Sequence, residues 1–217
     1  MEAALERAKA LLSHGRDNEA AEALAPWRDA SHPHVHFFAG VALQRAHQLQ
    51  PARAAYERAL QLEPALIFAR VNLVHVLVES RRFAEAEGHA TEACAREPHS
   101  AERHFLHALV LTEARKREAA IAALRRCLSI DPQKREAYVN LDALLLQEGD
   151  TAACRALARL AIREAQQSGD TFRFWAHELQ RPPHVVQVRA ETRNAKRHTL
   201  LARRALRRAA PCLLHGD

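Results

Sequence analysis

The stretch from Pro33 to Leu66 reads PHVHFFAGVALQRAHQLQPARAAYERALQLEPAL. In its second half, apolar residues stand at relative positions 0, 3, 4, 7 and 8: Ala52, Ala55, Tyr56, Ala59 and Leu60. This spacing places them along one side of an α-helix. An earlier apolar run begins at Phe37. Pro64 ends the second half, because proline lacks an amide hydrogen and disfavours helix in the residue before it. We therefore predict two helices joined by a turn near residues 47–50.

The same pattern returns every 34 residues along the chain. Three sets of residues keep this spacing: the prolines Pro64, Pro98 and Pro132, the leucines Leu43, Leu77, Leu111 and Leu145, and the alanines Ala52, Ala86 and Ala120. A fixed period of this length indicates units that stack on their neighbours, because one unit cannot bury its apolar face alone. In the fourth unit, Gln166 stands where the closing proline is expected.

We predict an all-α fold with an array over residues 1–168 and a separate C-terminal cap or basic segment over 169–217. The array is expected to hold about five repeats, with these bounds: 1–32, which is irregular, 33–66, 67–100, 101–134 and 135–168. An irregular first repeat is expected, because one side of a terminal unit faces solvent. The abundance of Ala, Leu, Arg and Glu favours helices throughout this part.

Five positions of the first regular unit resemble the tetratricopeptide repeat (TPR) family: Gly40, Ala52, Tyr56, Ala59 and Pro64. The resemblance covers roughly residues 3–168. It implies a superhelical solenoid of antiparallel helix pairs, in which the first helix of each pair lines a concave groove. It also implies that the protein works by binding other proteins.

The chain departs from the family pattern at the turn inside each pair and in its last pair. The turn favours glycine, which adopts a left-handed conformation cheaply. Only Gly15 and Gly149 provide it, while three equivalent places hold other residues: His47, Arg81 and Arg115. Asp142 also stands where a small apolar residue is expected. The last repeat is therefore expected to pack less tightly.

The resemblance predicts which residues line the groove. We expect one row of Phe37, Val71, Phe105 and Val139, and a second row of His75 with Val41, Leu109 and Ala143. Two asparagines, Asn72 and Asn140, occupy a position where peptide-binding members of the family often use asparagine. An amide there could pair with a ligand backbone, although surface polarity would explain both equally. The basic residues of a clamp for peptide carboxylates were not found.

The positive charge is concentrated near the C-terminus. Up to Asp170 there are 22 Lys and Arg against 23 Asp and Glu, whereas the remainder has 10 against 3. Four arginines of this remainder fall on one side of an expected helix: Arg203, Arg204, Arg207 and Arg208. The segment could cap the array or fill its groove, bind nucleic acid or an anionic membrane, or form a disordered tail.

A second, shorter resemblance begins at Trp175. With the run LQRPPH at 179–184, it is similar to the entry of the oxygenase domain in bacterial TPR proteins related to aspartyl/asparaginyl β-hydroxylases. That resemblance implies a β-helix domain in which two histidines and a carboxylate hold Fe(II). His215 and Asp217 have the local H-x-D form, but no strands or distal histidine follow. Under this alternative, the chain is the repeat arm of an oxygenase without its catalytic domain.

No pattern in the sequence predicts catalysis, a metal or a cofactor. The four cysteines Cys94, Cys127, Cys154 and Cys212 form no close pair, so neither a disulfide framework nor a zinc site is expected. His32, His34 and His36 alternate, but the run crosses into a helix, where steps of two residues turn side chains apart. We therefore expect a protein that is not an enzyme.

The expected function is a scaffold that binds a peptide or helix in an apolar groove. The alternatives are the oxygenase arm and an adaptor for nucleic acid or anionic membranes that works through the basic segment. The N-terminus has no secretory pattern and no window reaches 18 consecutive apolar residues, so a cytoplasmic location is expected. The partner's identity is not predicted.

Overall fold

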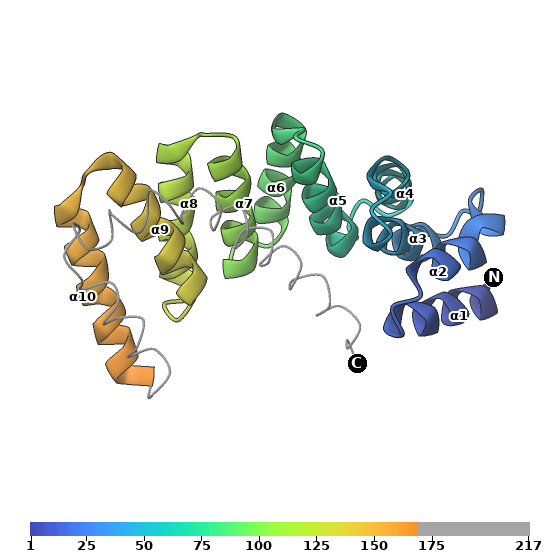
Figure 1. Ribbon diagram of the computed structural model, residues 1–217, viewed down its shortest axis with the longest axis horizontal. Coiled ribbons are helices and arrows are strands. Elements are labelled where there is room, and N and C mark those ends of the chain that lie inside the picture. The colour runs from blue at the N-terminus through green and yellow to red at the C-terminus, as the bar shows by residue number, and fades with distance from the viewer. Residues whose placement is uncertain (169–217) are drawn as a thin grey trace. The chain divides into compact units, whose positions relative to one another are not determined.

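The computed structural model describes residues 1–168, and all regular structure in this part is helical (Figure 1). The helices are α1 (Glu2–Ser13), α2 (Asp17–Leu24), the short 3-10 helix η1 (Ala25–Trp27), α3 (Pro33–Arg45), α4 (Leu49–Leu62), α5 (Ile67–Glu79), α6 (Phe83–Arg96), α7 (Ala101–Glu113), α8 (Arg117–Ile130), α9 (Arg135–Glu148) and α10 (Thr151–Ser168). The all-α fold expected from the sequence is confirmed. No helix of this part is long and apolar enough to cross a membrane. The basic-tail arginines and the segment around Trp175 lie outside the described residues.

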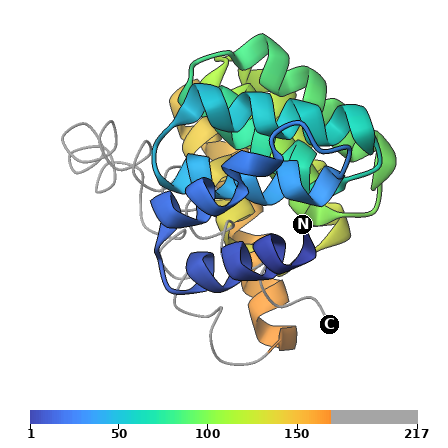
Figure 2. The same ribbon diagram turned by 90° about the vertical axis from the view of Figure 1, so that its right-hand side faces the viewer.

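The chain divides into two compact units, and the division falls within α6. Unit 1 comprises Met1–Ala93, and unit 2 begins at Cys94. In unit 1, α1 packs against α2, α3 against α4, and α4 against α5 (Figure 2). In unit 2, α7 packs against α8, α8 against α9, and α9 against α10. Each unit is thus a set of antiparallel helix pairs. The repeat boundaries expected from the sequence remain a prediction.

The prolines that keep the period end the second helix of a pair. The helix α4 stops at Leu62 and α8 at Ile130, each two residues before a proline. Glu63 adopts φ −138° and ψ 88°, the extended conformation that a following proline favours. The helix α10, which has Gln166 at the equivalent place, runs for 18 residues, whereas α4 and α8 have 14 each.

A left-handed residue ends the first helix of each pair. Gly15 and Gly149 have φ of 72° and 73°, and His47, Arg81 and Arg115 have φ of 59°, 58° and 59°. After each of them, a backbone amide donates to the carbonyl of a leucine five residues earlier. Gln48 N, for example, lies 2.8 Å from Leu43 O. This is the Schellman arrangement, and it gives the periodic leucines a backbone role as well as a packing role.

The crossing of α3 and α4 pairs a glycine with a tyrosine. A Cβ added at Gly40 would lie 2.6 Å from the ring of Tyr56, so only glycine fits there. The equivalent positions in the next two pairs hold Val74 with Ala90, and Ala108 with Leu124, and all four are buried. Bulk on one helix of a pair is thus matched by a smaller residue on the other.

The last pair places a carboxyl group at this crossing. Asp142 is half-buried, and burial raises its pKa against the effect of a hydrogen bond with Cys154. Burial, followed by the nearby Asp142 carboxylate, raises the pKa of Cys154 to about 12. The carboxyl group expected to disturb packing is therefore kept in a partly apolar site.

The residue six positions after the loop carbonyl ties three of the loops between pairs. His36 Nε2 lies 2.7 Å from Ala30 O, Arg70 Nη2 donates to Pro64 O at 2.8 Å, and His104 Nε2 lies 3.1 Å from Pro98 O. These contacts are again spaced by 34 residues. They use different side chains for one task, which is to hold the loop against the first turn of the next helix.

Candidate functional site

The first-helix face of unit 1 has an exposed aromatic residue at its edge. Phe68 is 42% exposed near the start of α5. It shares a helix face with Val71 and His75, because residues spaced by three, four and seven lie on one side of a helix. Sequence reasoning placed Val71 and His75 here but missed Phe68. Extending each row by one turn toward the helix start would have found it.

The structure buries much of the surface that the sequence assigned to the groove. Five of the ten residues are less than a tenth exposed: Phe37, Val71, His75, Phe105 and Leu109. Four others are partly exposed: Val41, Val139, Asn140 and Ala143. The accessible part of these faces is therefore narrower than two full rows. Most of the predicted residues can contribute to a binding surface only at its floor.

Asn72 takes part in a polar contact inside unit 1. It is 5% exposed, and its amide hydrogen-bonds the hydroxyl group of Tyr56. Burial raises the pKa of Tyr56, against that hydrogen bond. The hydroxyl remains a donor and reaches Gln44 Oε1 at 2.8 Å. The second asparagine, Asn140, donates from Nδ2 to Glu136 O at 2.7 Å within α9. Both asparagines thus have internal partners.

The first-helix face of unit 2 carries a charged pair beside its aromatic residue. Lys134 Nζ lies 5.7 Å from the ring centroid of Phe105 and 3.2 Å from Glu102 Oε1. Burial opposes ionisation of Glu102, but a backbone hydrogen bond and Lys134 together hold its pKa below the usual range. Phe68 of unit 1 and Glu102 of unit 2 are equivalent, 34 residues apart. The two faces therefore differ in chemistry, with an apolar edge in unit 1 and a charged edge in unit 2.

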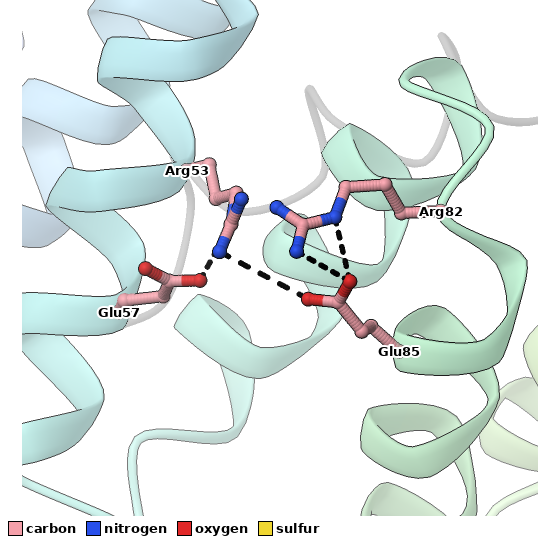
Figure 3. Close-up of polar contacts among 4 residues, drawn as sticks. All are labelled: Arg53, Glu57, Arg82 and Glu85. Carbon is pink, nitrogen blue, oxygen red and sulfur yellow. Dashed lines mark hydrogen bonds and ion pairs between the residues drawn. The ribbon is translucent and has the colours of Figure 1, made fainter.

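On the second-helix side of unit 1, four charged residues connect α4 to α6 (Figure 3). Arg53 Nε donates to Glu57 Oε1 at 2.6 Å, and Arg53 Nη2 lies 3.9 Å from Glu85 Oε2. Arg82 Nε donates to Glu85 Oε1 at 2.6 Å. Such exposed pairs contribute about 0–1 kcal/mol each, so the network orients these side chains more than it stabilises the fold.

The chemistry of the described residues gives no nucleophile or metal centre. Burial raises the pKa of Cys94 to about 11 and that of Cys127 to about 12, so both thiols are protonated and unreactive near neutral pH. Within residues 1–168, no group of three His, Cys, Asp or Glu side chains is placed to hold a metal ion. Among the alternating histidines, His36 instead bonds to the carbonyl of Ala30.

Helix pairs with a 34-residue period and left-handed turns define the tetratricopeptide class of fold. Residues 101–134 match the family model of the tetratricopeptide repeat. The chain is thus an all-α protein with the TPR solenoid fold, as the resemblance in its sequence implied.

Solved structures of TPR proteins resemble this fold. MamA (residues 41 to the end) from Desulfovibrio magneticus RS-1 superposes with a TM-score of 0.68 at 20% identity, covering 78% of this chain and 97% of that one. YrrB, described as a TPR protein with an unusual peptide-binding site, superposes with a TM-score of 0.63 at 17% identity, covering 81% of this chain and 90% of that one. A search of curated proteins found no match.

Proposed function

We propose that this protein is a non-catalytic scaffold that binds a peptide or helix of a partner protein on its first-helix faces. The observation that carries the proposal is Phe68, a large aromatic residue exposed on the face that also holds Val71. An exposed aromatic beside a buried apolar floor is the usual composition of an anchor position in a protein interface. The TPR fold and the peptide-binding site of YrrB support the proposal.

The partner is read through its side chains more than through its backbone. Reading an extended backbone would need amides that are available on the face, but Asn72 is buried against Tyr56 and Asn140 bonds to its own helix. The remaining groove residues are mostly apolar. The ligand is therefore a segment with apolar side chains, for which partly exposed residues such as Val41 and Val139 extend the contact in each unit.

The test is a substitution of the exposed anchor in the full chain. Phe68→Glu should lower the affinity for a captured partner by at least about tenfold, the loss expected when an interface anchor is replaced by a charge. Ala54→Glu, at an exposed site on α4, introduces the same charge away from the face and should leave binding unchanged. Because Phe68 is exposed, both variants should melt near the wild-type temperature.

Placing a photo-crosslinking amino acid at position 68 supplies a second readout. It should crosslink the same partner that Phe68→Glu loses, while position 54 should give no such product. Retention of every partner by Phe68→Glu, with no crosslink from position 68, would contradict the proposal.

A further inference from the structure

We propose that unit 1 carries a second binding site, a pocket between α4, α5 and α6 that receives an arginine or lysine side chain of a partner protein. The pocket has a volume of about 310 Å³ and is lined by Glu57, Leu60, Gln61, Arg70, Leu73 and His89. Phe68 lies on another face of α5, so this site is separate from the surface proposed above.

The base of the pocket is held in place by a buried arginine. Arg70 is 4% exposed, forms an ion pair with Glu92 and donates from Nη2 to Pro64 O at 2.8 Å. Its Nη1 also lies 3.4 Å from His89 Nδ1. Since a guanidinium can only donate, Nδ1 of His89 is the acceptor and its proton is on Nε2. The charge of Arg70 is thus matched within the protein and positions the pocket wall.

The walls combine an apolar stem-binding surface with an acidic edge. Leu60 and Leu73 offer contact for methylene groups, while Glu57 is 37% exposed and binds Arg53 through Oε1. A long basic side chain fits such a site because it buries an aliphatic stem and keeps a cation at the rim. A guanidinium can also donate several hydrogen bonds to one carboxylate, so arginine should bind more tightly than lysine.

The charges that act on His89 show the sign of the field in the pocket. Burial and then Arg70 lower the pKa of His89, while the carboxylates of Glu92, Glu57 and Glu85 act in the opposite direction. His89 is consequently neutral near pH 7 and does not repel a cation. Three carboxylates near the wall, against one guanidinium whose charge is already matched, favour a cationic ligand over an anionic one.

The test titrates the full chain with N-acetyl-arginine amide and follows the side-chain NMR signals of Leu60, Leu73 and His89. Saturable shifts are expected with the arginine probe and weaker ones with N-acetyl-lysine amide. The norleucine and glutamate amides should give none. Equal shifts with norleucine amide, tighter binding of glutamate amide, or no binding of the arginine probe would overturn the proposal.

Figure 3 provides the matched pair of variants, because Glu57 and Glu85 both contact Arg53 but only Glu57 lines the pocket. Glu57→Gln should weaken the arginine probe about three- to tenfold, the range for a partly exposed charge pair. Glu85→Gln should leave it near the wild-type affinity. Equal losses in both variants would mean that orientation of Arg53 matters and not the pocket carboxylate, which contradicts the site.

Two further variants separate this pocket from the Phe68 surface and from the chain's own basic segment. Phe68→Glu should bind the arginine probe normally, so failure of one proposal leaves the other to be judged on its own data. Replacing Arg203, Arg204, Arg207 and Arg208 by glutamine should also leave the probe affinity unchanged. Tighter binding in that variant would show that the chain's own arginines compete for the pocket, which overturns the assignment to a partner.

Discussion

Replacing His47, Arg81 or Arg115 by glycine should stabilise the protein, although each change removes a whole side chain. All three residues hold a left-handed backbone, with φ of 58–59°. A side chain in this region crowds the following carbonyl oxygen, whereas glycine has no Cβ and adopts it freely. The three side chains are exposed, and none of the hydrogen bonds or ion pairs found within residues 1–168 uses them. Nothing favourable is therefore lost.

The expected size follows from two opposing free energies. The left-handed conformation costs about 1–2 kcal/mol for a residue with a side chain. Glycine gives back about 0.5–1 kcal/mol of this, because its unfolded chain has more freedom to lose. Each substitution should therefore raise the free energy of unfolding by about 0.5–1 kcal/mol. The turns lie in separate helix pairs, so the triple variant should gain about 1.5–3 kcal/mol.

Urea unfolding followed by far-ultraviolet circular dichroism measures the effect, with the slope m checked for constancy. Gly149→Ala is the reverse control. Its added Cβ meets no atom within 4 Å, so only the backbone penalty acts and a loss of about 1 kcal/mol is expected. A lower midpoint for His47→Gly, or an unchanged midpoint for Gly149→Ala, would refute the reasoning.

Three further substitutions test the packing of the pairs. Gly40→Ala should cost about 1–3 kcal/mol by overpacking against Tyr56, and adding Tyr56→Leu should recover part of that loss in thermal melts. Since the pKa of Asp142 is raised in the folded state, wild-type stability should fall as pH rises from about 4 through that raised pKa, and Asp142→Asn should remove the fall in urea titrations at several pH values. Arg70→Lys loses a planar fork of donors and should cost about 1–3 kcal/mol by chemical denaturation, whereas Glu92→Gln, at the more exposed partner, should cost less.

The helical fold could be predicted from the sequence because it depends on periodicity. Helix type, the ends before Pro64 and Pro132, and the special turn positions all follow from residue spacing and local backbone chemistry. These features need no knowledge of side-chain conformation. A residue such as His47 in a left-handed turn is recognisable only because Gly149 occupies the equivalent place.

The binding surface was less predictable because it depends on which side chains meet. The position of Asn72 suggests a ligand contact, but its amide bonds to Tyr56, a residue sixteen positions earlier on another helix. Helical spacing places Phe105 on the right face but does not reveal that Lys134 approaches its ring. The pocket beside Arg70 also depends on three helices meeting. Such features require tertiary structure.

The matching of bulk across each pair bears on how such a chain can evolve. A larger residue at Gly40 is harmful while Tyr56 remains, yet Val74 is accommodated at the equivalent position opposite Ala90. The effect of a mutation at one of these sites therefore depends on the residue that occupies the other. Related sequences should change the two sites together, through compensatory steps, and a family consensus applied to only one of them should reduce fitness. Recombination that exchanges whole helix pairs avoids this conflict, because both partners are inherited together.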